Sequence, residues 1–102
     1  MATNIKAITS CLGYQQITSL SSATGLTVPT IDPTTGLTVK ANFALITPEA
    51  QAVRWRDDGT SPSASVGMPL AVGVTLQYDG DLSKIKFIQQ VSGGIINISY
   101  YV

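Results

Sequence analysis

The fold class predicted for this chain depends most on ten residues, Gln51-Ala-Val-Arg-Trp-Arg-Asp-Asp-Gly-Thr60. They contain its only tryptophan and its only two arginines, in a sequence in which 12% of the residues are charged. Val53 and Trp55 alternate with Arg54 and Arg56, which is the two-residue period of a β-strand. The Asp-Gly pair that follows is typical of a tight hairpin turn. We therefore expect a strand that turns its tryptophan toward a core and its two guanidinium groups outward.

The same alternation of apolar and polar side chains recurs along the chain, between turns rich in Gly, Pro and Asp. It predicts further strands over residues 13–20, 37–47, 74–78, 84–87 and 96–102. Pro69 cannot donate a backbone hydrogen bond, so the stretch around it is not a central strand. About seven short strands and no helical period predict an antiparallel β-sandwich, with Ig-like and jelly-roll topologies both open.

The apolar sides of these runs predict the core residues. They are Phe43, Trp55, Leu76, Ile85, Phe87, Ile96 and Ile98. A short repeat, Ala23-Thr-Gly-Leu-Thr-Val28 and Thr34-Thr-Gly-Leu-Thr-Val39, is interpreted as a hairpin whose arms share composition, with a recent insertion as the alternative. The whole of 1–102 is expected to be one domain, with 1–12 an arm or an edge strand.

Composition narrows the class of function. Formal net charge is zero, which argues against nucleic acid as a partner and against a polybasic membrane surface. No apolar run approaches the ~20 residues of a membrane-spanning helix. There is no histidine and one cysteine, so the commonest general base and an internal disulfide are absent from the sequence. We expect no catalytic activity, no cofactor and no metal. A surface this poor in charge is weakly protected against self-association, so a homo-oligomer is expected, with a trimer favoured.

Four aspartates are the first candidate binding residues, because they sit on two expected turns, at Asp57 and Asp58 and at Asp79 and Asp81. If the turns met, their oxygens could hold calcium. The alternative is that Asp simply suits turn geometry, and the spacing matches no calcium loop. Neither reading makes them catalytic.

The two arginines, Arg54 and Arg56, could each grip a carboxylate of a partner through two parallel hydrogen bonds. The alternative is local pairing with Asp57, Asp58 or Glu49. The partner-binding residues expected from the sequence are Arg54, Arg56, Asp57, Asp58, Asp79 and Asp81.

Aromatic residues offer one further hypothesis. The four tyrosines and the tryptophan could together form a platform on which sugars stack. Aromatics at alternating strand positions more often belong to a core. The residues concerned are Tyr14, Trp55, Tyr78, Tyr100 and Tyr101.

An ordered set of short patterns resembles small virion structural proteins of tailed bacteriophages. The set consists of Ala-Val-Arg-Trp-Arg-Asp-Asp-Gly-Thr at 52–60, Pro-Ser-Ala-Ser-Val-Gly-Met-Pro-Leu at 62–70, Tyr-Asp-Gly-Asp-Leu at 78–82, Ile-Lys-Phe-Ile-Gln at 85–89 and Ile-Ser-Tyr-Tyr at 98–101. It covers roughly half of the chain. The run 53–62 is also similar to a strand and turn of Ig-like modules appended to bacterial glycosidases, which carry no catalytic residues.

The phage resemblance implies a non-enzymatic virion component, and the role it favours is that of a capsid auxiliary (cement or decoration) protein that stabilises the head. Its partners would be the major capsid protein or other virion proteins, and it would be assembled into the virion in the host cytoplasm. Two alternatives stay open: a tail, head–tail connector or fibre-associated adhesion module, and a free carbohydrate-binding module.

Overall fold

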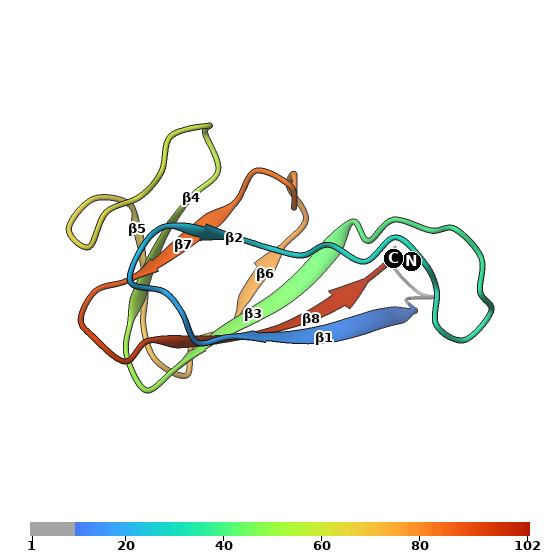
Figure 1. The fold of residues 1–102 in the computed structure, drawn as a ribbon, viewed down its shortest axis with the longest axis horizontal. Coiled ribbons are helices and arrows are strands. Elements are labelled where there is room, and N and C mark those ends of the chain that lie inside the picture. Colours follow the sequence, from blue (N-terminus) through green and yellow to red (C-terminus); the bar gives the residue numbers. More distant parts are fainter. Residues whose placement is uncertain (1–9) are drawn as a thin grey trace, which may run out of the picture.

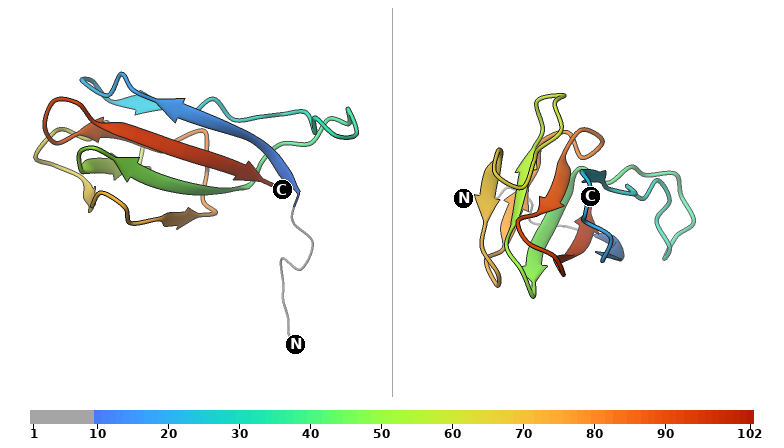
Figure 2. Two further views of the ribbon diagram at one scale, coloured as in Figure 1. Left: turned by 90° about the horizontal axis from the view of Figure 1, so that it is seen from below. Right: turned by 60° about the vertical axis from the view of Figure 1, so that its left-hand side comes forward.

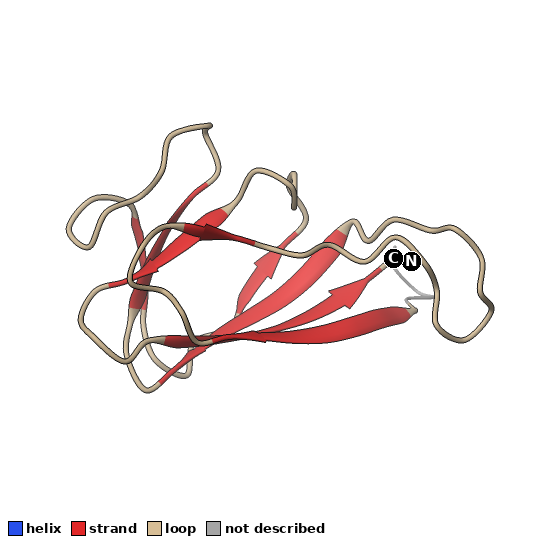
Figure 3. Cartoon of the chain, in the orientation of Figure 1, coloured by secondary structure: helices blue, strands red, loops and turns tan. Residues whose placement is uncertain are grey.

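The computed structural model describes residues 10–102 as an all-β structure, in which this part of the chain forms no helix (Figure 3). No segment in that range could cross a membrane as an apolar helix. The strands number eight rather than about seven. They are β1 (Cys11–Ile17), β2 (Thr24–Gly25), β3 (Phe43–Glu49), β4 (Val53–Arg56), β5 (Met68–Leu70), β6 (Leu76–Tyr78), β7 (Lys86–Gln89) and β8 (Ile95–Tyr101).

The strands form two four-stranded antiparallel sheets, of order β1-β8-β3-β6 and β2-β7-β4-β5, which confirms the expected sandwich (Figure 1). Their pairing is nested: β1 pairs with β8, β2 with β7, β3 with β6 and β4 with β5. A long antiparallel hairpin rolled into two sheets gives this order, which is jelly-roll topology. The structure thereby decides between the two topologies that the sequence left open.

Side chains from both sheets meet in one core, and the last strand supplies its centre. Ile96, Ile98 and Tyr100 point inward along β8, and Ile85 and Phe87 meet them from around β7. Four of the seven predicted core residues, the isoleucines at 85, 96 and 98 and the phenylalanine at 87, are therefore confirmed as buried. Alternation located them correctly because only one face of each of these runs is apolar.

The prediction for β3 was wrong in its phase. Ala44 and Ile46 are fully buried, whereas Phe43 is half-buried on the outer face, where its ring centroid lies 5.9 Å from that of Tyr101. Both faces of this run carry apolar side chains, so the period alone could not choose between them. Residues 40–42 are irregular and do not continue the alternation of β3. Ala41 and Ala44 are both buried although they are three residues apart, which a regular strand would not allow.

Two other predicted core residues, Trp55 and Leu76, are only partly buried at the margin of the core. Each lies in a short strand, and their neighbours Val53 and Tyr78 take the buried positions instead. Pro69 lies in β5, an outermost strand, in agreement with the exclusion of a central strand there.

The repeated segments do not form the two arms of one hairpin. The first copy pairs through Thr24–Gly25 with β7. The second copy is the return arm of a hairpin with the residues that link the copies: Ile31 bridges Thr38, and Val39 N–H donates to the Thr30 carbonyl. This hairpin extends beyond the ends of β1 and β8, at the right of Figure 1 and of the left view in Figure 2.

Strand β1 forms one edge of its sheet and starts and ends earlier than the predicted strand 13–20. Its ladder with β8 is interrupted between Cys11 and Gly13, where one residue is bulged out of register. Of the expected N-terminal arm or edge strand, 1–9 lie outside the described residues, and Cys11 and Leu12 open β1.

Candidate functional site

An open hollow of about 400 Å³ lies where β4 ends, between that strand and the segment that leads into β5. Three of its residues, Arg56, Asp57 and Asp58, are among the six expected to bind a partner. The half-buried ring of Trp55 supplies an aromatic surface. The lining consists of Trp55, Arg56, Asp57, Asp58, Val66, Gly67 and Met68.

The charged rim of the hollow is an ion pair within one turn. Arg56 donates from Nε to Oδ1 of Asp58 at 3.0 Å and from Nη2 to Oδ2 at 2.5 Å. This bond lowers the pKa of the Asp58 carboxyl and raises that of the guanidinium. The local pairing expected for this arginine is confirmed. Because both groups are exposed to solvent, the pair shapes the rim more than it stabilises the fold.

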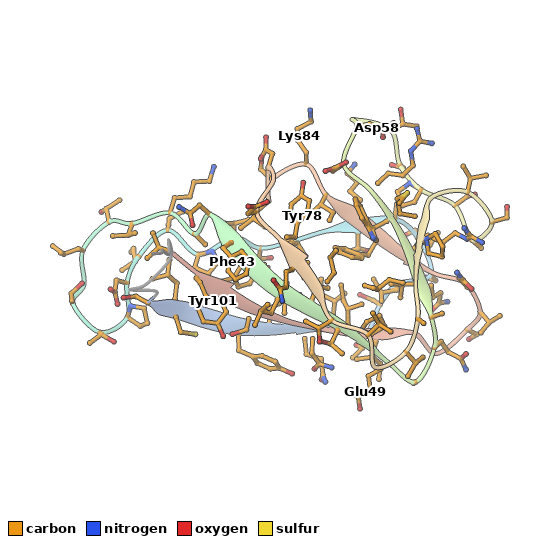
Figure 4. The ribbon with its side chains drawn as sticks, turned by 180° about the vertical axis from the view of Figure 1, so that it is seen from behind. Phe43, Glu49, Asp58, Tyr78, Lys84 and Tyr101 are labelled. Atoms are coloured by element: carbon orange, nitrogen blue, oxygen red, sulfur yellow. The ribbon has the colours of Figure 1, made fainter. Side chains whose placement is uncertain are left out.

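The second acid of the hollow ties it to the core. Tyr78, which is 7% exposed, donates its hydroxyl to Oδ2 of Asp57 at 2.7 Å and lies 3.4 Å from the carbonyl oxygen of Asp81. Burial raises the pKa of the Tyr78 hydroxyl, and the bond to Asp57 raises it further. The edge of the tyrosine ring also meets Trp55, with centroids 6.1 Å apart. The two aspartate-bearing turns are thus joined through a buried tyrosine (Figure 4).

The turn that carries Asp79 and Asp81 does not line the hollow. Asp81 accepts from both the backbone N–H and the hydroxyl of Ser83, and these bonds lower the pKa of its carboxyl. Asp79 is exposed on the same turn. In Figure 4 Asp58 and Lys84 reach outward on the same side of the sandwich, and Tyr78 lies below them, at the end of β6.

The remaining predicted residue, Arg54, supports the wall of the hollow. Its Nε donates to the carbonyl of Ala64 at 3.2 Å and its Nη1 to the carbonyl of Gly67 at 2.9 Å. No local carboxylate takes these two nitrogens, so the alternative of local ion pairing is wrong for Arg54. At Gly67, where φ is +141°, an added Cβ would lie 3.2 Å from the Cβ atoms of Arg54 and Pro62. The loop is therefore packed closely against β4.

The hollow combines charged groups that already have partners within the chain with an apolar wall. Among residues 10–102, no three Asp, Glu, Cys or His side chains come close enough together to hold a metal ion. The three ionisable groups of the hollow all have partners: Arg56 and Asp58 hold each other, and Asp57 accepts from Tyr78. The hollow therefore exposes an apolar wall beside a fixed charged rim.

The aromatic platform does not form as one surface. Tyr78 and Tyr100 are buried in the core, Tyr14 lies exposed on the outer face of β1, and Trp55 borders the hollow. Burial raises the pKa of Tyr100 to about 12. Trp55 is the single aromatic residue that lines the hollow.

Sequence reasoning missed Val66, Gly67 and Met68, which form the far wall of the hollow. Val66 and Met68 are about half exposed, at 54% and 55%. The sequence does contain a signal for them, because no charged residue occurs in 60–77 and Val66 and Met68 lie within this uncharged segment. Comparisons of the chain with protein-family models, with curated proteins and with solved structures found no match. The phage resemblance therefore stays a prediction.

Proposed function

We propose that this protein is a non-enzymatic structural component of a tailed-phage virion, a capsid auxiliary protein that docks on the head through the hollow at the end of β4. The observation that carries the proposal is the make-up of this hollow. Protein interfaces combine an apolar centre, rich in Trp and Met, with a polar rim, and the hollow places Trp55, Val66 and Met68 beside the Arg56–Asp58 pair.

The fold and the charge of the chain support the same proposal. A sandwich with zero net charge is not strongly repelled by the capsid subunits at whose junctions it would bind. Each copy would bury a modest area, and the many symmetry-related copies together would stabilise the head. Jelly-roll domains serve as building blocks of viral capsids, although the fold alone does not define a function. The step to a phage particle depends on the ordered sequence patterns between 52 and 101.

A second candidate is a module that binds host glycan, on the tail or free in solution. The lining of the hollow supports this candidate. Trp55 offers a ring on which a sugar can stack, and the carboxylates of Asp57 and Asp58 can accept hydrogen bonds from the sugar hydroxyls.

Quantitative mass spectrometry of purified particles separates the candidates. We expect hundreds of copies per particle for a capsid role, whereas about six or twelve would place the protein in the tail or neck. Absence from the particle would contradict the virion proposal. A signal from a glycan array would then favour the second candidate.

The role of the hollow itself is tested by binding to capsids that lack the protein. We expect Val66→Asp to weaken binding by at least about tenfold, because it puts a charge in the apolar wall. Val91→Asp is the matched control, since Val91 is exposed to a similar degree, 56%, in the turn between β7 and β8 and does not line the hollow. Equal binding by both variants would exclude the hollow as the docking surface.

A further inference from the structure

The four edges of the two sheets are protected to very different degrees. Edge strands pair with other chains unless they are short or carry charge, proline or bulges. β2 has two residues, β6 has three, and β5 has three with Pro69 in the middle. β1 has seven, and the sequence has no charged residue between Lys6 and Asp32. Within residues 10–102, the bulge at Leu12 is the only such device on β1, and it leaves the strand from Gly13 to Ile17 regular.

The hydrogen-bond pattern shows which groups of β1 face outward. Ser10 and Val102 exchange both backbone bonds, at 3.3 and 3.0 Å, and such pairs alternate along an antiparallel ladder. Along β8 the residues whose backbone groups face β1 are therefore Val102, Tyr100 and Ile98. Gln15 lies opposite Ile98, so its backbone groups face β8. Those of Tyr14 and Gln16 point away from β8, to the edge on which no strand of residues 10–102 pairs with β1. Two donors and two acceptors on one short, straight segment are thus available to another strand.

We propose that β1 is a self-association surface, at which two copies of this chain pair antiparallel about a two-fold axis at Gln15. In this register Tyr14 of one subunit lies opposite Gln16 of the partner subunit, and their outward groups form about four backbone hydrogen bonds. The two β1-β8-β3-β6 sheets then become one continuous sheet across the dimer.

A second copy fits this edge for two reasons. The segment is self-complementary, because inverting it about Gln15 places the outward groups of Tyr14 against those of Gln16 and brings no charge against another. The side chains also suit the junction: Tyr14, 65% exposed, and Gln16 both bond Oδ1 of their own Asn97 and so stand fixed on the outer face beside the axis.

This pairing forms a closed dimer, because it uses β1 of each subunit, the one long edge strand within residues 10–102. It therefore predicts a dimer in place of the trimer favoured from composition. It is independent of the role in a virion, since the surface is remote in the sheet order from β4 and β5, and it can be tested on the purified chain alone.

The first test is the molar mass by light scattering over a range of protein concentration, with two variants. We expect the mass to rise from one chain to two. Gln16→Lys should weaken pairing at least about tenfold, because it sets two ammonium groups on a diagonal of about 7–8 Å across the axis. Gln77→Lys makes the same change at an exposed site on β6, the opposite edge of the sheet, and should leave pairing unchanged. A mass of one chain at every concentration, a trimer, or equal weakening by both variants would overturn the proposal.

The second test needs no variant and reads the backbone directly. Amide hydrogen exchange of the wild-type chain is compared at low concentration and at one where about nine-tenths of the chains are paired. The Tyr14 and Gln16 amides should exchange about tenfold more slowly in the paired state, because only the free tenth exposes them. The Gln15 amide, bonded to β8 in both states, should not change. Equal exchange of all three at both concentrations would refute the edge pairing.

Discussion

The Tyr78 hydroxyl is the link between the hollow and the core, and Tyr78→Phe removes it without disturbing the ring. The hydroxyl donates to the Asp57 carboxylate at 2.7 Å from a side chain that is 7% exposed. A hydrogen bond to a charged group contributes about 1.5–3 kcal/mol, and the partly exposed carboxylate places this one at the lower end. We expect Tyr78→Phe to lower the free energy of unfolding by about 1.5 kcal/mol. Tyr14→Phe, at an exposed tyrosine, is the matched control and should cost less than about 0.5 kcal/mol.

The assay is urea unfolding followed by the fluorescence of Trp55, the only tryptophan, whose ring lies 6.1 Å from that of Tyr78. A double-mutant cycle with Asp57→Asn isolates the bond, and we expect a coupling free energy of about 1 kcal/mol. If Tyr78→Phe costs no more than Tyr14→Phe, or if the two changes at 57 and 78 simply add, the proposed link between the hollow and the core is refuted.

Three further predictions concern the loops and the core. In Gly80→Ala the new Cβ would lie 2.5 Å from Oη and 2.6 Å from Cζ of Tyr78, so we expect a loss of about 1–3 kcal/mol in urea unfolding, whereas Gly25→Ala, whose nearest contact would be 3.9 Å, should be tolerated. Burial raises the pKa of Tyr100 to about 12 from 10.0. The folded chain therefore keeps this proton after the unfolded chain has lost it, and Tyr100 alone should lower the free energy of unfolding by roughly 2 kcal/mol as the pH rises from about 10 to 12. Tyr78, whose pKa is also raised, adds to this fall, so Tyr100→Phe should make this part of an alkaline titration less steep, and an unchanged slope would contradict the prediction. Arg54→Met keeps the aliphatic stem but loses the two bonds to loop carbonyls, so proteolysis within 60–67 should become faster, and an unchanged rate would show that these bonds do not hold the loop.

The sequence predicts the fold class correctly because several strands carry apolar side chains on one face only. The alternation of Ile96 and Ile98 with Asn97 and Ser99 leaves one orientation for β8. In β3 both faces are apolar, and the orientation that buried Phe43 was the wrong one. Which face is buried there depends on the register with β6 and β8, pairings that a local pattern does not contain.

The candidate site could be predicted only in part, for a similar reason. The pairing of Arg56 with Asp58 is local and follows from their spacing. The bond between Asp57 and Tyr78 joins the turn after β4 to β6, a strand of the other sheet. The sequence could therefore suggest that the two turns meet, but not which group joins them. The apolar wall at Met68 was missed because a short edge strand with a proline gives almost no periodic signal.

The nested pairing of strands also determines the order in which the chain can fold as it is made. β4 and β5 are close in sequence and can meet early, whereas β1 gains its partner only when β8, residues Ile95–Tyr101, has left the ribosome. At a synthesis rate of about 5–20 residues per second, β1 waits on the order of ten seconds without a partner strand. Long-range pairings of this kind also make folding itself slow. Nascent chains on one message therefore expose identical uncharged strands to one another before any of them has folded.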